Sequence, residues 1–251
     1  LTPEQQRASR LATGDLNASF SVSGPTLPPA STAIKLNVFD SVLGGEPFTL
    51  NTKALVSTAD EGALSRVSDL DTQLSLGKNQ LSATGALGRA DDELKLVGKL
   101  AALKTFDSRL AGQLNLDGSL QGAFDMLRAR LMASGSRLSF RQPDATIRLR
   151  ALEIDANVPL TATVEPDAKI ALKLSADRFR MGETNLRRTR LNINGTPDKH
   201  SYDASVSSGK WAGRLKGQGE AALGEQASWT TTINRLDVDG DLKARLRGRP
   251  T

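Results

Sequence analysis

The chain has 251 residues, of which 4% are aromatic and none is Cys, and its formal net charge is +5. The absence of Cys excludes a disulfide-stapled secreted fold and a Cys-ligated metal site, but is compatible with both the cytosol and the bacterial periplasm. No apolar run approaches the roughly 18 residues that a membrane-spanning helix needs, and the first ten residues lack the apolar core of a signal peptide.

A short helix is predicted over residues 1–13. Thr2 can cap this helix, Pro3 suits its first position, and Gln5 completes a capping-box spacing. Its apolar face would consist of Ala8, Leu11 and Ala12.

From Gly14 onward, apolar residues recur at every second position, which predicts β-strands. Gly, Asn and Asp stand between the alternating segments, as hairpin turns require. No long helical pattern separates these segments, so we expect an all-β fold with a mostly antiparallel sheet. The alternating segments are DLNASFSVSG (15–24), AIKLNVF (33–39), DLDTQLSL (69–76), ELKLVGKL (93–100), QLNLDGSLQG (113–122), KIALKLSADRF (169–179), RLNINGT (190–196), SYDASVSSG (201–209) and SWTTTINRLDVDG (228–240).

One segment, ATIRLRALEIDANV (145–158), contains a slip in the alternation. Ile147, Leu149 and Ala151 follow one phase, and Leu152 and Ile154 follow the other. Such a slip turns side chains to the opposite face of a sheet unless a bulge absorbs it.

The sequence also contains internal similarity. GDLNASFSVSG from Gly14 aligns with GQLNLDGSLQG from Gly112, and PFTLNTKAL from Pro47 aligns with DATIRLRAL from Asp144. After the helix at 1–13, we therefore predict two copies of a strand-rich unit, 14–108 and 109–251, within one continuous elongated domain.

The chain offers no set of residues typical of an enzyme, a metal site or a cofactor site. His200 is the only His and no G-x-S-x-G motif is present, so we expect His200 to be a surface turn residue. DVDGD (237–241) has calcium-like spacing but lacks the Gly and Glu of an EF-hand loop, which favours a polar turn. DDE (91–93) is interpreted as a solvated turn.

The basic residues do not predict a nucleic-acid site, because stacking aromatic rings are too few and too scattered. The densest basic cluster is Arg187, Arg188 and Arg190. It fits either a solvated surface or weak attraction to anionic lipid headgroups, worth about 1 kcal/mol per nearby cation.

The apolar face of the predicted strands consists of aliphatic residues with few rings. Aliphatic side chains can fill a closed sandwich, although aromatic rings usually contribute to that packing. The alternative is a curved sheet whose concave apolar face stays partly open. Such a trough suits alkyl chains, since each CH₂ removed from water contributes about 0.8 kcal/mol.

Four segments resemble the TamB family of AsmA-like, bridge-like lipid transfer proteins. They are GKNQLSATGALGRADDELKL (77–96), RLAGQLNLDGSLQG (109–122), INGTPDKHSYDASV (193–206) and SWTTTINRLDVDG (228–240). The most specific features are the Gly-Thr turn that leads to His200, and Trp229 followed by Ile-Asn-Arg-Leu at 233–236.

The resemblance implies an elongated, curled β-sheet (a β-taco) with an apolar groove. It implies a periplasmic location in a Gram-negative bacterium, with the full-length protein anchored in the inner membrane by a helix that this chain lacks. It further implies phospholipid transport toward the outer membrane, partnership with an outer-membrane TamA-like barrel and a role in outer-membrane protein assembly. The family has no catalytic residues to carry over, and we expect this chain to be an internal fragment.

On this interpretation, one set of aliphatic residues lines the lipid groove. An alternative is a scaffold that pairs with unfolded outer-membrane strands through exposed sheet edges, and another is an extracellular β-sandwich with a filled core. The predicted groove residues are Leu74, Leu76, Leu94, Leu96, Leu114, Leu116, Ile147, Leu149, Ile170, Leu172, Leu174, Leu191, Ile193 and Val206.

Overall fold

The computed structural model describes residues 14–25, 27, 30–59, 62–160, 168–222, 228–241 and 243–247. The helix predicted over residues 1–13 lies outside the described residues. The chain divides after Leu127 into two compact units, unit 1 and unit 2.

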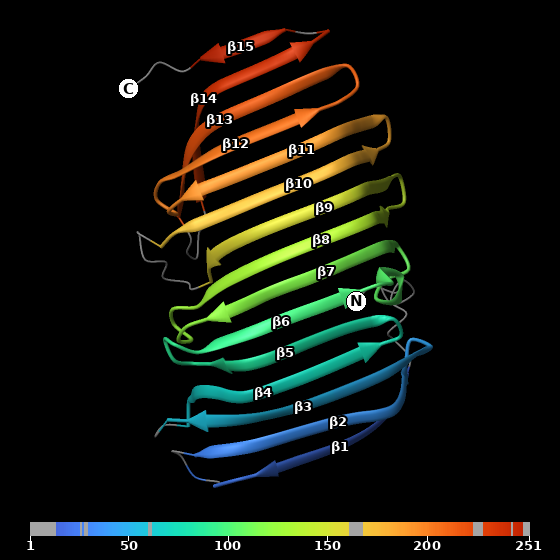
Figure 1. Ribbon diagram of the computed structural model, residues 1–251, viewed down its shortest axis with the longest axis vertical. Helices are drawn as coiled ribbons and strands as arrows, with labels where there is room; N and C mark the ends of the chain where they lie inside the picture. The colour runs from blue at the N-terminus through green and yellow to red at the C-terminus, as the bar shows by residue number, and fades with distance from the viewer. Residues whose placement is uncertain are drawn as a thin grey trace. The chain divides into compact units, whose positions relative to one another are not determined.

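The described part of unit 1 is an antiparallel sheet of seven strands in chain order, in which each strand pairs with the next. Figure 1 shows them side by side, from blue to green. A short 3₁₀ turn, η2 (Leu103–Thr105), precedes the last strand. The strands are β1 (Gly14–Ser23), β2 (Ser31–Leu43), β3 (Glu46–Thr58), β4 (Leu64–Leu76), β5 (Asn79–Leu87), β6 (Glu93–Leu100) and β7 (Leu110–Gln121).

The described part of unit 2 is likewise an antiparallel sheet, with eight strands in chain order. The predicted all-β, antiparallel, curled architecture is thus confirmed for both units. The strands are β8 (Arg128–Arg141), β9 (Thr146–Pro159), β10 (Ile170–Met181), β11 (Thr184–Gly195), β12 (His200–Ser207), β13 (Trp211–Ala222), β14 (Ser228–Gly240) and β15 (Ala244–Arg247).

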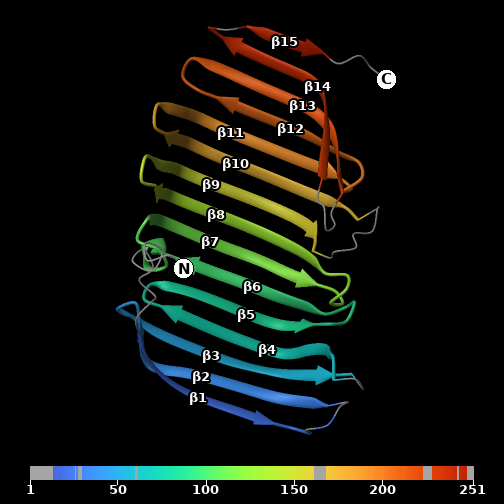
Figure 2. The same cartoon turned by 180° about the vertical axis from the view of Figure 1, so that it is seen from behind.

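The strands of each unit form a single layer. In the two opposite views of Figures 1 and 2, no helix or second sheet among the described residues covers the strands of either unit. The filled sandwich that we considered as an alternative requires such a second layer. No helix of the described residues is long and apolar enough to span a membrane.

Few apolar side chains are fully removed from water in this arrangement. Among the described residues, the buried hydrophobic ones are Val38, Leu76, Leu94, Ala133, Ala176 and Tyr202. Most other apolar residues of the strands are half-buried, and the largest fully buried side chain is the polar Asn79. The packing is therefore spread along one face of each sheet instead of being concentrated in a closed core.

In the described part of the chain, four non-glycine residues have a left-handed backbone: Asp40, Asp69, Arg137 and Arg178. Asp40 and Asp69 each lie at a register shift, between β2 and β3 and between β4 and β5 respectively. Asp tolerates this conformation because its short side chain can hydrogen-bond locally. The two Arg residues lie in unit 2, where the recorded pairing on both sides of them continues without a shift.

Candidate functional site

The apolar residues of unit 1 form continuous rows across its strands. One row crosses from β2 to β7 through Val38, Leu50, Leu74, Leu81, Gly98 and Leu116. Neighbouring rows on the same face carry Leu36 and Leu96, Leu76 and Leu114, and Leu94 and Leu120. The six predicted groove residues of unit 1 therefore share one face of the sheet.

Gly98 continues the first row without a side chain of its own. A Cβ built there would lie 2.8 Å from Leu81 Cδ2 and 3.3 Å from Leu116 Cβ. The two leucines therefore close over this glycine, which keeps the row aliphatic across β5, β6 and β7.

The apolar residues of unit 2 also form rows across neighbouring strands. One row joins Leu131, Ala156, Leu172, Ile193, Tyr202 and Gly217, and the next joins Ala133, Ile154, Leu174, Leu191, Ala204, Leu215 and Leu236. Val206 lies in a third row, opposite Thr189. Ile170, the first residue of β10, pairs with Gly195, the last residue of β11.

The slip predicted in 145–158 is real, and it changes the phase of burial along β9. Ile147, Leu149 and Ala151 are half-buried, as are Leu152 and Ile154, while Arg148, Arg150, Glu153 and Asp155 are exposed. Ile147 and Leu149 are thus half-buried, and Leu149 also lines the hollow that contains Arg148 and Arg150.

The opposite face of each unit is polar and locally hollowed. In unit 1, a hollow of about 700 Å³ over β2–β6 is lined mainly by polar residues, among them Asn37, Asn51, Gln73, Ser82 and Lys99. Leu74 also lines this hollow, and Leu149 and Val206 line hollows of unit 2. The apolar groove stays a prediction, because what the structure establishes is a shared apolar face.

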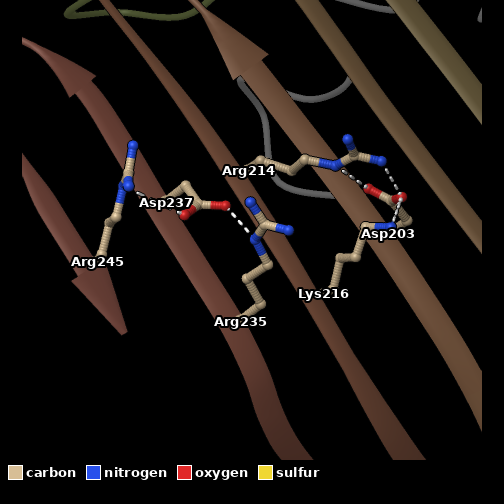
Figure 3. Close-up of polar contacts among 6 residues, drawn as sticks. All are labelled: Asp203, Arg214, Lys216, Arg235, Asp237 and Arg245. Atoms are coloured by element: carbon tan, nitrogen blue, oxygen red, sulfur yellow. Dashed lines mark hydrogen bonds and ion pairs between the residues drawn. The ribbon is translucent and has the colours of Figure 1, made fainter. Parts of the chain in front are cut away.

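The polar face of β12–β15 carries a network of ion pairs (Figure 3). Arg214 Nη2 lies 2.6 Å from Asp203 Oδ2, and Lys216 Nζ lies 3.3 Å from the same oxygen. The Arg214 hydrogen bond, more than Lys216, holds the pKa of Asp203 below its ordinary value. Asp237 contacts both Arg235 and Arg245.

Two expectations about polar segments are corrected by the structure. Asp237 and Asp239 of DVDGD lie within β14 and not in a turn, because the strand continues to Gly240. The DDE segment is not fully solvated, because Asp92 is buried and Arg66 donates two hydrogen bonds to its carboxylate, at 2.6 and 3.0 Å.

His200 is also placed differently from the prediction. It is only 3% exposed at the start of β12, and its Nδ1 lies 3.2 Å from the Pro197 carbonyl oxygen. His200 pairs with Gly219 of β13, and Pro197 in the turn before it is buried. Among the described residues, no group of three or more His, Asp or Glu could hold a metal ion.

Residues 11–246 match the family described as TamB, N-terminal domain. The chain belongs to the TamB family. Neither a search of curated proteins nor a search of solved structures gave a match. Membership in the TamB family indicates a protein of the bacterial envelope.

Proposed function

We propose that this TamB-family chain is part of a periplasm-spanning protein that carries phospholipids between the inner and outer membranes. The acyl chains would contact the apolar rows of each unit. The full-length protein would be anchored in the inner membrane and meet a TamA-like barrel of the translocation and assembly module at the outer membrane.

The observation that supports this proposal is the incomplete burial of a continuous aliphatic face. Leu96 is 37% exposed, and it stands beside Ala83 in a row that reaches Leu36 through Thr52 and Thr72. Contiguous apolar surface left in water often marks a binding surface. A non-directional aliphatic contact suits a ligand that slides, and the charged headgroup can remain in water.

A charge on this face tests the proposal. We expect Leu172→Arg in the full-length protein to leave the fold intact and to stop phospholipid transfer, because a cation in the row would have to lose its hydration as acyl chains pass. Asn157→Arg, on the exposed side of neighbouring β9, adds the same side chain to the polar face and should preserve transfer. Native mass spectrometry of the wild-type chain should detect co-purified phospholipid. Normal transfer by a folded Leu172→Arg protein would refute the proposal.

An exposed edge strand supports a second candidate function, the scaffolding of unfolded outer-membrane strands. All ten residues of β1 are exposed, and among the described residues this strand pairs only with β2. Such an edge can accept another strand by main-chain hydrogen bonding. If this function dominates, the double substitution Ser19→Lys and Ser21→Lys should impair outer-membrane protein assembly more than Leu172→Arg does.

A further inference from the structure

The polar face of unit 2 contains an arginine-lined hollow that the proposed lipid pathway does not use. The hollow has a volume of about 810 Å³ and lies over β8–β11. Its remaining lining consists of Leu138, Ser139, Leu149 and Asn185. The six arginines are Arg137, Arg148, Arg150, Arg178, Arg180 and Arg187.

The strand register concentrates four of these arginines in one row. Ser136 pairs with Ala151 and Leu138 pairs with Leu149, which places Arg137 opposite Arg150. On the β9 side, Asp177 pairs with Ala151, which places Arg178 opposite Arg150. On the β11 side, Asp177 pairs with Arg188 and Phe179 pairs with Leu186, which places Arg178 opposite Arg187. Arg148 and Arg180 pair directly, two residues further along. Like charges placed opposite each other destabilise a sheet.

The backbone is strained at two points to produce this arrangement. Arg137 and Arg178 have φ angles of 52° and 54°, a conformation that is costly for a long side chain. At each of them two consecutive residues are exposed, Ser136 with Arg137 and Asp177 with Arg178. The phase of burial therefore changes at this row, and both guanidinium groups join the polar face.

Acidic partners do not offset this charge. Among the described residues, none of the salt bridges includes any of the six arginines. Asp177, the nearest acid in the register, lies 3.7 Å from Arg188 instead. On β12–β15, in contrast, Asp203 and Asp237 pair with the neighbouring cations (Figure 3). Within the described part of unit 2, the hollow therefore gathers six arginines without a salt bridge to an acidic side chain.

We propose that this hollow binds a compact anion that carries two or more phosphate groups. Guanidinium groups bind phosphate oxygens in a bidentate geometry, and several of them converge here. The volume lies within the range of about 300–1,000 Å³ that is usual for small-ligand sites. None of the described residues that line the hollow is aromatic, so they do not offer the stacking that single-stranded nucleic acids require. The phosphates could belong to a lipid headgroup or to a soluble polyphosphate.

Calorimetric titration of the chain with tripolyphosphate tests the site. We expect saturable binding that weakens as salt concentration rises. The triple substitution Arg148→Gln, Arg178→Gln and Arg187→Gln should weaken it at least tenfold, because each charge-assisted contact contributes strongly. The matched control Arg130→Gln, Lys173→Gln and Arg190→Gln removes the same charge from exposed positions of the same unit and should bind like the wild type.

Vesicle binding distinguishes the two sources of phosphate. Phosphatidylcholine vesicles with cardiolipin present paired phosphates on a lipid, and pure phosphatidylcholine vesicles are the comparison. If a headgroup is the ligand, tripolyphosphate should displace the chain from cardiolipin vesicles, and the hollow variant should not bind them. Equal tripolyphosphate binding by the wild type and the hollow variant would overturn the proposal. Binding of polyglutamate that tripolyphosphate does not displace would assign the hollow to an acidic polypeptide and would also overturn it.

Melting temperature and tripolyphosphate binding of two Arg178 variants test whether the backbone strain at Arg178 is linked to anion binding. Arg178→Gly relieves both the strain and the repulsion, whereas Arg178→Gln relieves only the repulsion. We expect both variants to bind tripolyphosphate more weakly, and the Gly variant to have the higher melting temperature of the two. A Gly variant that melts below the Gln variant but binds normally would contradict the proposal.

Discussion

Asn79 and Ala102 are joined by two hydrogen bonds that tie the start of β5 to the segment after β6. Asn79 Nδ2 donates to the Ala102 carbonyl oxygen at 3.2 Å, and the Ala102 N–H donates to Asn79 Oδ1 at 2.9 Å. Asn79 Nδ2 also donates to the Leu76 carbonyl oxygen at 3.1 Å, and the side chain is completely buried. The side chain thus adds hydrogen bonds at the position where Asn79 also pairs with Leu76 of β4 and Leu100 of β6.

We expect Asn79→Ala to lower the free energy of unfolding by about 2–3 kcal/mol, because the Ala102 N–H and two carbonyl groups would lose buried partners. Urea denaturation followed by circular dichroism measures this. Gln80→Ala, at the adjacent exposed position on β5, is the control and should change stability by less than about 0.5 kcal/mol. Equal effects of the two substitutions would contradict the role assigned to Asn79.

The Arg66–Asp92 pair makes the stability of unit 1 depend on pH in the acid range. The hydrogen bonds from Arg66 are the main cause that holds the pKa of Asp92 below its ordinary value of about 4. Because the folded-state pKa is the lower one, the stabilisation is complete above about pH 5 and is lost as pH falls through the folded-state pKa. Asp92→Asn should flatten the dependence of thermal stability on pH below about 5. An unchanged acid profile in a folded Asp92→Asn protein would show that other carboxylates dominate.

Gly217 provides the space that Tyr202 occupies in unit 2. A Cβ at Gly217 would lie 2.2 Å from Tyr202 Oη and 2.3 Å from the Thr232 carbonyl oxygen. Thr231 Oγ1 donates a hydrogen bond of 2.6 Å to the same phenol oxygen, which holds the ring in place. Gly217→Ala should therefore cost about 1–3 kcal/mol of unfolding free energy through overpacking. Gly213→Ala, on the same strand, meets Val206 Cγ1 at an ordinary 3.4 Å and should cost less in the same denaturation experiment.

The ion pairs on β12–β15 should contribute little to stability despite their short distances. Arg214 is about half exposed and Asp203 about one-third exposed, so water and salt screen their attraction. Arg214→Gln should therefore change the free energy of unfolding by less than about 1 kcal/mol, and any effect should shrink in 0.5 M NaCl as the Debye length falls below about 10 Å. A larger loss that persists in high salt would indicate a packing role for the Arg214 stem.

The alternation of residue types by itself predicted many of the strands and the residues that share a face within each of them, although β8 and β13 have no counterpart among the predicted segments. Period-two patterning is a local property, and Leu74 with Leu76, or Leu172 with Leu174, can be assigned to one face from neighbours in the chain alone. The same pattern indicated the slip near Ala151. It could not show that the neighbouring strands β8 and β10 have a left-handed backbone at Arg137 and Arg178.

The tertiary structure decided which residues meet across strands. Arg137 and Arg178 are 41 positions apart, and their common row depends on turn lengths and on the register of β8–β11, which a one-residue change would undo. Asp92 was expected to be a solvated turn residue and His200 a surface one, since nothing in their local sequence indicates that Arg66 and the Pro197 carbonyl lie beside them. Burial and charge pairing come from contacts between strands, and the sequence pattern along one strand carries no record of those contacts.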